Sequence, residues 1–174
     1  MPMIPRMIPE VKETVRRRRE QDPAEIARGA VRVDLRQIEQ FTIEARTRGE
    51  HEQTFIIDEA VGRGGLGKGA SPLGHFLGGA AACFMVWIIK LAVDADMPFD
   101  DLKVLARGRI NRHVGGGFEA FTYTVQMTSP EPSEKVRALL AQVPEYCFVH
   151  STLQKFLPMK VELELNGGPA VAID

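Results

Sequence analysis

One segment constrains the fold more than any other: from Ser71 to about Ala95 the chain is apolar on nearly every side. Ser71 is a favoured helix N-cap, and the following Pro72 is tolerated at the first helical position. A helix whose middle is apolar all round has no face suited to water, so the sequence predicts a central, buried helix. Glycines and alanines from Gly78 to Ala82 would let another backbone approach this helix closely.

Composition and charge exclude several classes of function. The net charge of −1 provides no basic excess for binding nucleic acid. The longest uninterrupted apolar run, Ala80 to Ile89, is about half of the roughly 18–20 residues that a membrane span needs. The stretch from Met1 to Pro9 lacks the basic-then-apolar order of a signal peptide. We therefore expect a cytoplasmic protein that binds neither a membrane nor nucleic acid.

Strands are expected on both sides of the apolar helix, because apolar residues alternate with polar ones. In one segment Phe121, Tyr123 and Val125 fall on a single face. The expected strands are 31–36, 41–45, 54–57, 102–112, 118–127 and 159–165. Short turns join most successive strands, so the sequence predicts mostly antiparallel pairing and the α+β fold class. We assign residues 30–174 to one globular domain and residues 1–29 to an N-terminal helical extension.

Three further helices are expected, over residues 11–21, 133–143 and 146–156. Asp22-Pro23 should end the first, Ser133 should cap the second, and Pro144 should break the second. The first helix carries a block of four arginines, Arg16 to Arg19. This block is interpreted as a solvated helix face or, alternatively, as a contact for a phosphate or a partner.

The two cysteines are the residues most suited to chemistry. Cys83 and Cys147 are far apart in the sequence, and form neither a CxxC redox motif nor a zinc knuckle, so we expect no metal site. They are either inert core residues or a working thiol pair, since a structural disulfide is not expected in a reducing compartment. Cys83 lies mid-helix, as core cysteines do. Cys147 lies near a helix start, which favours a thiolate, with His150 one turn further on.

Two motifs around these cysteines are similar to those of a known family. The first is a glycine-rich loop, a Ser-Pro helix start and a helix of small residues that reaches Ala-Ala-Cys; the second surrounds Cys147. The matching segments are 58–59, 64–73, 76–77, 80–84, 145–147 and 151–153. Over about Val31 to Leu165, the chain thus resembles the OsmC/Ohr family.

That resemblance implies an OsmC-like fold, in which antiparallel sheets wrap around central helices in an intertwined homodimer. It also implies thiol-dependent reduction of a small organic hydroperoxide. Cys83 would attack the peroxide and become a sulfenic acid, and Cys147 would resolve the sulfenic acid as a disulfide. A thiol or lipoyl dithiol from outside the protein would then reduce the disulfide, so no bound cofactor is expected.

The implied chemistry also needs a cation beside the thiolate and an apolar pocket for the peroxide tail. The resemblance assigns the cation to Arg63, nine positions before Pro72; the alternative is a solvated loop arginine. Candidates for the substrate pocket are His75, Phe76, Phe84 and Trp87. Aromatic residues at helical spacing equally suit an ordinary core.

One position departs from the family pattern. The active peroxidases carry a glutamate directly after the motif proline, where it holds the arginine, and Leu73 stands there in this chain. Glu59 and His75 are the candidates to replace it. The departure is typical of a wider OsmC-like branch and favours an alternative function. In that alternative, the chain is a non-catalytic protein that binds a hydrophobic ligand in the dimer cleft, or a redox sensor.

Overall fold

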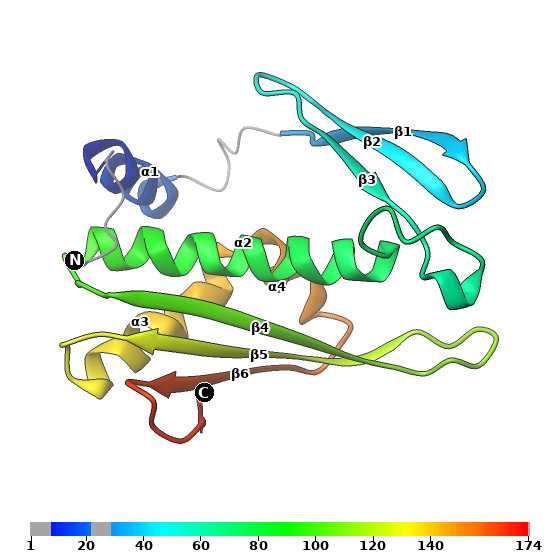
Figure 1. The fold of residues 1–174 in the computed structure, drawn as a ribbon. Helices are drawn as coiled ribbons and strands as arrows, with labels where there is room; N and C mark the ends of the chain where they lie inside the picture. The colour runs from blue at the N-terminus through cyan, green and yellow to red at the C-terminus, as the bar shows by residue number, and fades with distance from the viewer. Residues whose placement is uncertain (1–7, 22–28, 174) are drawn as a thin grey trace. The chain divides into compact units, whose positions relative to one another are not determined.

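The computed structural model describes residues 8–21 and 29–173, which form two compact units. The first unit (residues 8–21 and 79–173) contains α1 (Ile8–Glu20), β4 (Asp101–Ile110), β5 (Phe118–Thr128), α3 (Ser133–Tyr146), α4 (Phe148–Leu153), β6 (Met159–Leu165) and β7 (Val171–Ala172). The second unit (residues 29–78) contains β1 (Arg32–Glu39), β2 (Thr42–Arg48), β3 (Thr54–Ile57) and the 3₁₀-helix η2 (Val61–Arg63). Helix α2 (Pro72–Asp94) begins in the second unit and continues into the first (Figure 1). The α+β class predicted from the sequence is confirmed.

Helix α2 begins and ends close to the predicted residues. The Ser71 hydroxyl accepts a hydrogen bond from the backbone N–H of Gly74 at 3.2 Å, as an N-cap does. Inside the first unit the side chains of Phe84, Ile88 and Leu91 are buried. Each large apolar side chain buried in this way stabilises the fold by about 1.5–3 kcal/mol. The predicted central helix is therefore the core element of the first unit.

Among the helices of residues 8–21 and 29–173, α2 alone is long and apolar enough to cross a membrane by length and composition. Its most apolar 18-residue window has a mean hydropathy of 2.0. The longest uninterrupted apolar run, Ala80 to Ile89, is shorter than this window because Gly79 and Lys90 interrupt the apolar residues. In the structure 44% of the window is buried, and its buried side chains join the core formed with the sheet and the other helices of the first unit.

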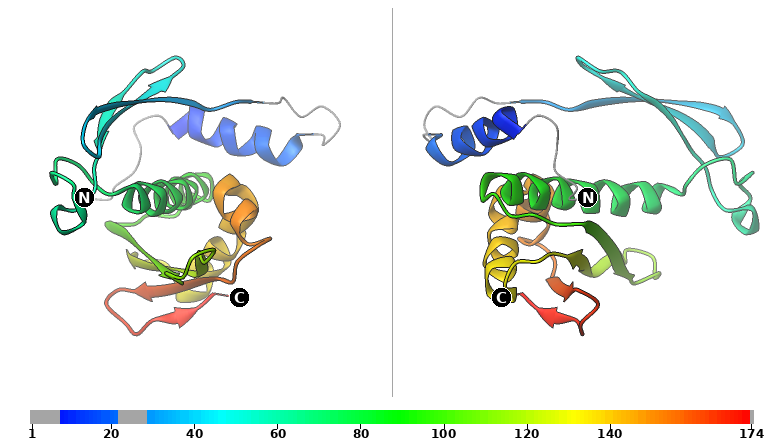
Figure 2. Two further views of the ribbon diagram at one scale, coloured as in Figure 1. Left: turned by 90° about the vertical axis from the view of Figure 1, so that its right-hand side faces the viewer. Right: turned by 60° about the vertical axis from the view of Figure 1, so that its left-hand side comes forward.

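The sheet of the first unit has the order β4-β5-β6-β7. β4 pairs antiparallel with β5, and β6 pairs antiparallel with β7, as the mostly antiparallel prediction requires. The exception is β6, which pairs parallel with β5, because α3 and α4 form a crossover between these two strands. Phe121, Tyr123 and Val125 on β5 are fully buried on the face that α2 covers (Figures 1 and 2).

Two predicted boundaries of α3 are wrong. Ser133 is the first helical residue and not the cap; Pro132 holds the cap position, without a side-chain hydrogen bond. Pro144 lies inside the helix, which continues to Tyr146. Proline removes only its own amide donor, and one turn later the N–H of Cys147 still donates to the Val143 carbonyl at 3.0 Å.

Helix α1 packs onto the first unit, with Val15 fully buried. It begins three residues before the predicted start at Val11, and the predicted stop at Asp22-Pro23 lies outside the described residues. The arginine block is not a uniformly solvated face. Arg16 and Arg17 pair with glutamates of α1 itself, whereas Arg18 and Arg19 contact side chains of α2, α3 and α4.

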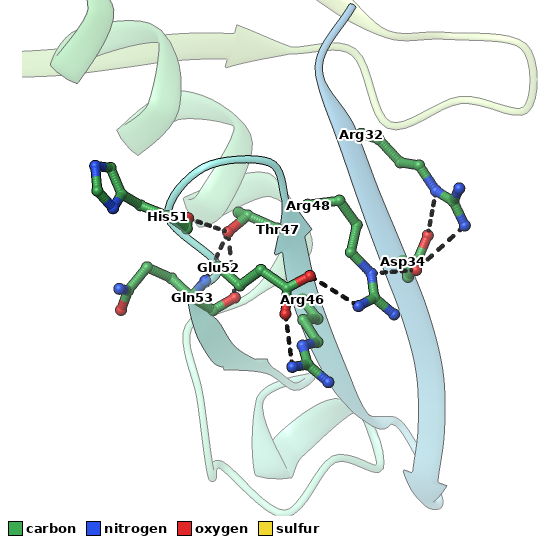
Figure 3. Close-up of polar contacts among 8 residues, drawn as sticks. All are labelled: Arg32, Asp34, Arg46, Thr47, Arg48, His51, Glu52 and Gln53. Atoms are coloured by element: carbon green, nitrogen blue, oxygen red, sulfur yellow. Dashed lines mark hydrogen bonds and ion pairs between the residues drawn. The ribbon is translucent and has the colours of Figure 1, made fainter.

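The second unit is built on the antiparallel sheet β1-β2-β3, which has one charged and one apolar face. On the charged face Asp34 accepts from Arg32 and Arg48, at 2.8 and 2.6 Å (Figure 3). Glu52 continues the network, with Arg46 at 2.6 Å and Arg48 at 3.0 Å. Surface ion pairs contribute little stability singly, but a linked set fixes the hairpin geometry.

A glycine-rich loop follows β3 and is organised by one carboxylate. Asp58 is buried and accepts backbone hydrogen bonds from Glu59 at 2.8 Å, Leu66 at 3.1 Å and Lys68 at 3.0 Å. Burial pushes the pKa of Asp58 upward, but these donors, together with the Thr42 hydroxyl, bring it below its ordinary value. The carboxylate therefore holds the loop that leads into α2.

Candidate functional site

The two predicted cysteines meet in the first unit. Cys83 lies on α2, and Cys147 occupies the single residue between α3 and α4. The two sulfur atoms are 3.3 Å apart, with the Cys147 thiol donating to the Cys83 sulfur. Both are free thiols, and a disulfide would require the sulfurs to approach to about 2.05 Å. Residues far apart in the sequence thus form a pair within reach of a disulfide.

Cys147 is the more enclosed of the two sulfurs. Its side chain is fully buried, and its sulfur caps α4 by accepting the backbone N–H of His150 at 3.5 Å. The helix start was expected to favour the thiolate, but burial has the larger effect and raises the pKa of Cys147 well above its ordinary value. Cys147 therefore keeps its proton at neutral pH.

Cys83 differs from its partner in exposure. Its side chain is half-buried, whereas that of Cys147 is fully buried, so Cys83 is the more exposed cysteine of the pair. Its sulfur accepts the hydrogen bond from the protonated Cys147 thiol. The two thiols thus have different surroundings: one is accessible, and the other is enclosed and holds a proton.

Aromatic rings from three elements surround the cysteine pair. The Phe84 ring stacks on Tyr123 with centroids 4.9 Å apart and lies 5.3 Å from the His150 ring. The Tyr123 hydroxyl and the Nδ1 atom of His150 are buried with no hydrogen-bond partner among the described residues. Burial raises the pKa of Tyr123 to about 12, and the nearby Cys147 and Cys83 add to the shift.

Neither the Tyr123 hydroxyl nor the His150 ring was predicted from the sequence to be a buried polar group without a hydrogen-bond partner. Tyr123 was interpreted only as a core residue of a strand, and no sequence pattern links it to the cysteines. His150 was interpreted either as a partner of Cys147, one turn away, or as a surface histidine. In the structure its backbone N–H makes that contact, while its ring packs on Phe84 and burial lowers its pKa.

The predicted pocket residues lie in different surroundings. Phe84 and Trp87 are buried in the core of the first unit, where Trp87 lies 5.2 Å from the Tyr146 ring. His75 and Phe76 belong to the second unit. There the His75 ring stacks on Phe55 at 5.2 Å, and Phe76 is 44% exposed. Their contact with a substrate stays a prediction.

Arg63 also lies in the second unit and has a carboxylate partner. Its Nε atom lies 2.5 Å from a carboxylate oxygen of Glu59, one of the two residues expected to replace the motif glutamate. Leu73, at the position of that glutamate, is 41% exposed. The role of Arg63 toward the cysteines stays a prediction. Within the described ranges, no three His, Cys, Asp or Glu side chains gather as metal ligands would.

The fold agrees with the comparisons to known proteins. The model of the OsmC-like protein family matches residues 65–162, more than half of the chain. The chain therefore belongs to the OsmC-like family. No curated protein matches the sequence.

Solved structures share the fold at low sequence identity. An OsmC-like protein from Mycoplasma pneumoniae superposes with a TM-score of 0.69 at 19% identity, covering 80% of this chain and 99% of its own. An organic hydroperoxide resistance protein from Legionella pneumophila gives 0.59 at 17% identity, with 80% and 99% covered. One from Elizabethkingia anophelis, with thiocyanate bound, gives 0.61 at 18%, with 80% and 99% covered. These likenesses establish the fold.

Proposed function

We propose that this protein is a thiol peroxidase that reduces organic hydroperoxides through Cys83 and Cys147. The single observation that supports it most is the 3.3 Å contact between an accessible sulfur and an enclosed, protonated one. Two similar folds belong to proteins described as organic hydroperoxide resistance proteins, which points to the same class of substrate.

The unequal surroundings of the two thiols assign each a step. The Cys83 thiolate attacks the outer peroxide oxygen of ROOH and the O–O bond breaks, which forms Cys83 sulfenic acid; the alkoxide leaves and takes a proton from solvent to become ROH. The Cys147 sulfur then attacks the sulfenic sulfur and gives up its proton, releasing water and forming the Cys83–Cys147 disulfide. Two electrons pass from the two thiols to the peroxide. An external thiol or lipoyl dithiol returns them by disulfide exchange, so the protein needs no bound cofactor.

We expect cumene hydroperoxide to remove both free thiols of the reduced protein rapidly. Cys83→Ser should abolish the rapid loss, because the accessible sulfur takes the first step. Cys147→Ser should still lose its one thiol, as a sulfenic acid that dimedone traps, because only the resolving step is missing. Thiol titration against time and mass spectrometry of the products measure these outcomes. Thiol loss no faster than that of free cysteine would rule out the peroxidase.

Leu73 supports a second candidate, a non-catalytic protein that binds a hydrophobic ligand or senses oxidants. Leu73 offers no carboxylate at the position where the active peroxidases of the family carry the glutamate that orients their arginine. The Glu59 carboxylate, 2.5 Å from Arg63, supports the peroxidase instead, because it supplies such a partner from the loop. We assign Arg63 the role of the activating cation on this basis. Slow thiol loss with tight binding of an apolar probe would favour the second candidate.

We further propose a cytoplasmic homodimer. Strand β1 lies at an edge of its sheet, and all but one of its residues are exposed. Val33 and Leu35 on its apolar face are 43% and 64% exposed. An apolar edge strand of this kind is a liability in a monomer and is ordinarily covered by a partner. A reducing compartment suits the two free thiols.

A further inference from the structure

Two consecutive arginines of α1 contact the two residues that flank Cys147. The Arg18 guanidinium lies over the Phe148 ring, 4.2 Å from its centroid. The Nε atom of Arg19 donates to the Tyr146 hydroxyl at 3.0 Å. All of these residues belong to the first unit, in which α1 lies on the side of α2 opposite the sheet (Figure 2). We call residues Tyr146-Cys147-Phe148 the Cys147 turn, and Arg18 with Arg19 the arginine clamp.

The clamp is itself anchored to the helix that carries Cys83. An Nη atom of Arg19 pairs with the Asp94 carboxylate at 2.7 Å, at the C-terminal end of α2. One planar guanidinium thus bridges α2 and the Cys147 turn, a task for which its fixed fork of donors is suited. Val15, one turn before the clamp, is fully buried and holds α1 in place.

The position of the Cys147 turn determines how closely the Cys147 sulfur approaches the Cys83 sulfur. Cys147 has no regular structure of its own, since it lies between the end of α3 and the start of α4. The sulfurs must close from 3.3 Å to about 2.05 Å to bond, so a small displacement of the turn changes how often they react. Contacts that fix both neighbours of Cys147 therefore raise the effective concentration of its sulfur at Cys83.

We propose that the arginine clamp is a positioning device for the Cys147 turn, and that it stabilises the Cys83–Cys147 disulfide relative to the dithiol. The family model matches residues 65–162, so α1 and the clamp lie outside it. The proposal builds on the proposed function, since the disulfide it tunes is the one that the peroxidase cycle forms. Arg18 and Arg19 act through Cys147 and take no part in the reaction themselves.

The test measures the equilibrium constant for thiol–disulfide exchange between the full chain and glutathione. In this exchange one oxidised glutathione takes the place of the peroxide as the oxidant. Two reduced glutathiones are released as the Cys83–Cys147 disulfide forms. Arg18→Gln with Arg19→Gln should lower the equilibrium constant for the disulfide about tenfold, which corresponds to ~30 mV for a two-electron couple. Tyr146→Phe removes the acceptor of Arg19 without changing α1, so it should move the constant less and in the same direction.

Two control variants separate positioning from general stability. Arg16→Gln with Arg17→Gln makes the same change of charge in the same helix, but the ion pairs of these arginines among residues 8–21 and 29–173 are with glutamates of α1 itself. Lys12→Gln removes the ion pair of α1 to Asp96, at 2.7 Å, which includes no residue of the Cys147 turn. Neither control should move the constant. Urea denaturation of the reduced proteins reports the stability of each variant separately.

Certain results would overturn the proposal. The proposal is wrong if the equilibrium constant is unchanged or raised in both the clamp variant and Tyr146→Phe. It is also wrong if the constant falls as much in the Lys12→Gln control as in the clamp variant. Glutathione exchange requires no peroxide, so the clamp and the peroxidase fail separately. If the clamp variants shift the equilibrium constant but the protein does not react with peroxide, only the clamp proposal stands. If the protein reacts rapidly with peroxide but the clamp variants do not shift the constant, only the peroxidase proposal stands.

Discussion

The sulfur atoms of Cys83 and Cys147 lie only 3.3 Å apart, yet the two side chains differ in how deeply they are buried. One cysteine is half-buried, and the other is fully buried at the start of a helix. Desolvation favours the neutral thiol at Cys147, and the helix N-terminus, which favours the anion, does not outweigh it. Burial, which a single sequence does not display, therefore keeps the proton on Cys147.

The shifted groups around the pair predict how stability depends on pH. Burial raises the pKa of Cys147 and Tyr123 in the folded protein, so the unfolded chain releases these protons at lower pH. Stability is then fully present below pH ~8.5 and falls as pH rises, by at most ~1.4 kcal/mol per pH unit for each group. The pKa of His150 is lowered, so stability also falls as pH drops below about 6.5.

Urea denaturation of the reduced protein from pH 5 to pH 11 checks this prediction. Tyr123→Phe should flatten the part of the profile above pH ~10, because it removes the second group that titrates there. It should also stabilise the protein by about 1 kcal/mol at pH 7, since a buried hydroxyl without a partner is lost. A profile that stays level from pH 8 to pH 11 would contradict the assigned burial of both groups.

Among the elements, the glycine-rich loop has the strictest requirement for its sequence. A Cβ atom on Gly65 would lie 1.8 Å from the carbonyl oxygen of Glu59, a clash with backbone that cannot move aside easily. We expect Gly65→Ala to lower the free energy of unfolding by about 3 kcal/mol, the upper end of overpacking costs.

Gly62→Ala is the matched control, because a Cβ atom there meets nothing within 4 Å. Urea denaturation and the rate of proteolysis in the loop measure both variants. Equal stability of the two variants would show that the loop does not hold the close approach at Gly65.

Local patterns predicted most elements, and long-range contacts account for what was missed. Alternation located the strands, and β6 lies at the residues predicted for it, Met159–Leu165. The fate of Pro144 depends on the hydrogen bonds of the following turn, and the parallel pairing of β6 depends on the crossover before it. The contacts of Arg18 with Phe148 and of Arg19 with Tyr146 join residues more than a hundred positions apart, which helical periodicity does not encode.

The same distinction applies to the candidate site. The cysteines and Glu59 were found from motifs, because their residue types and spacing are local features. Tyr123 and the clamp were not found, because their relevance depends on which elements pack around Cys147. The clamp lies in the segment that the family motifs do not reach.

For the whole molecule, the exposed apolar residues of β1 predict self-association. Leu35→Asp places a charge on the apolar face of this edge strand and should convert the proposed dimer to a monomer. Arg36→Gln is the control, since Arg36 pairs with Glu44 on the charged face. Light scattering with size-exclusion chromatography measures both. A wild-type chain that elutes as a monomer would contradict the prediction.

The sulfur of Cys147 also accepts a hydrogen bond from the backbone N–H of His150, in the first turn of α4. When that sulfur enters a disulfide it becomes a poorer acceptor, and the end of the helix loses part of its anchorage. We therefore expect oxidation of the pair to loosen the start of α4. One sulfur atom serves both the proposed redox chemistry and the cap of this short helix.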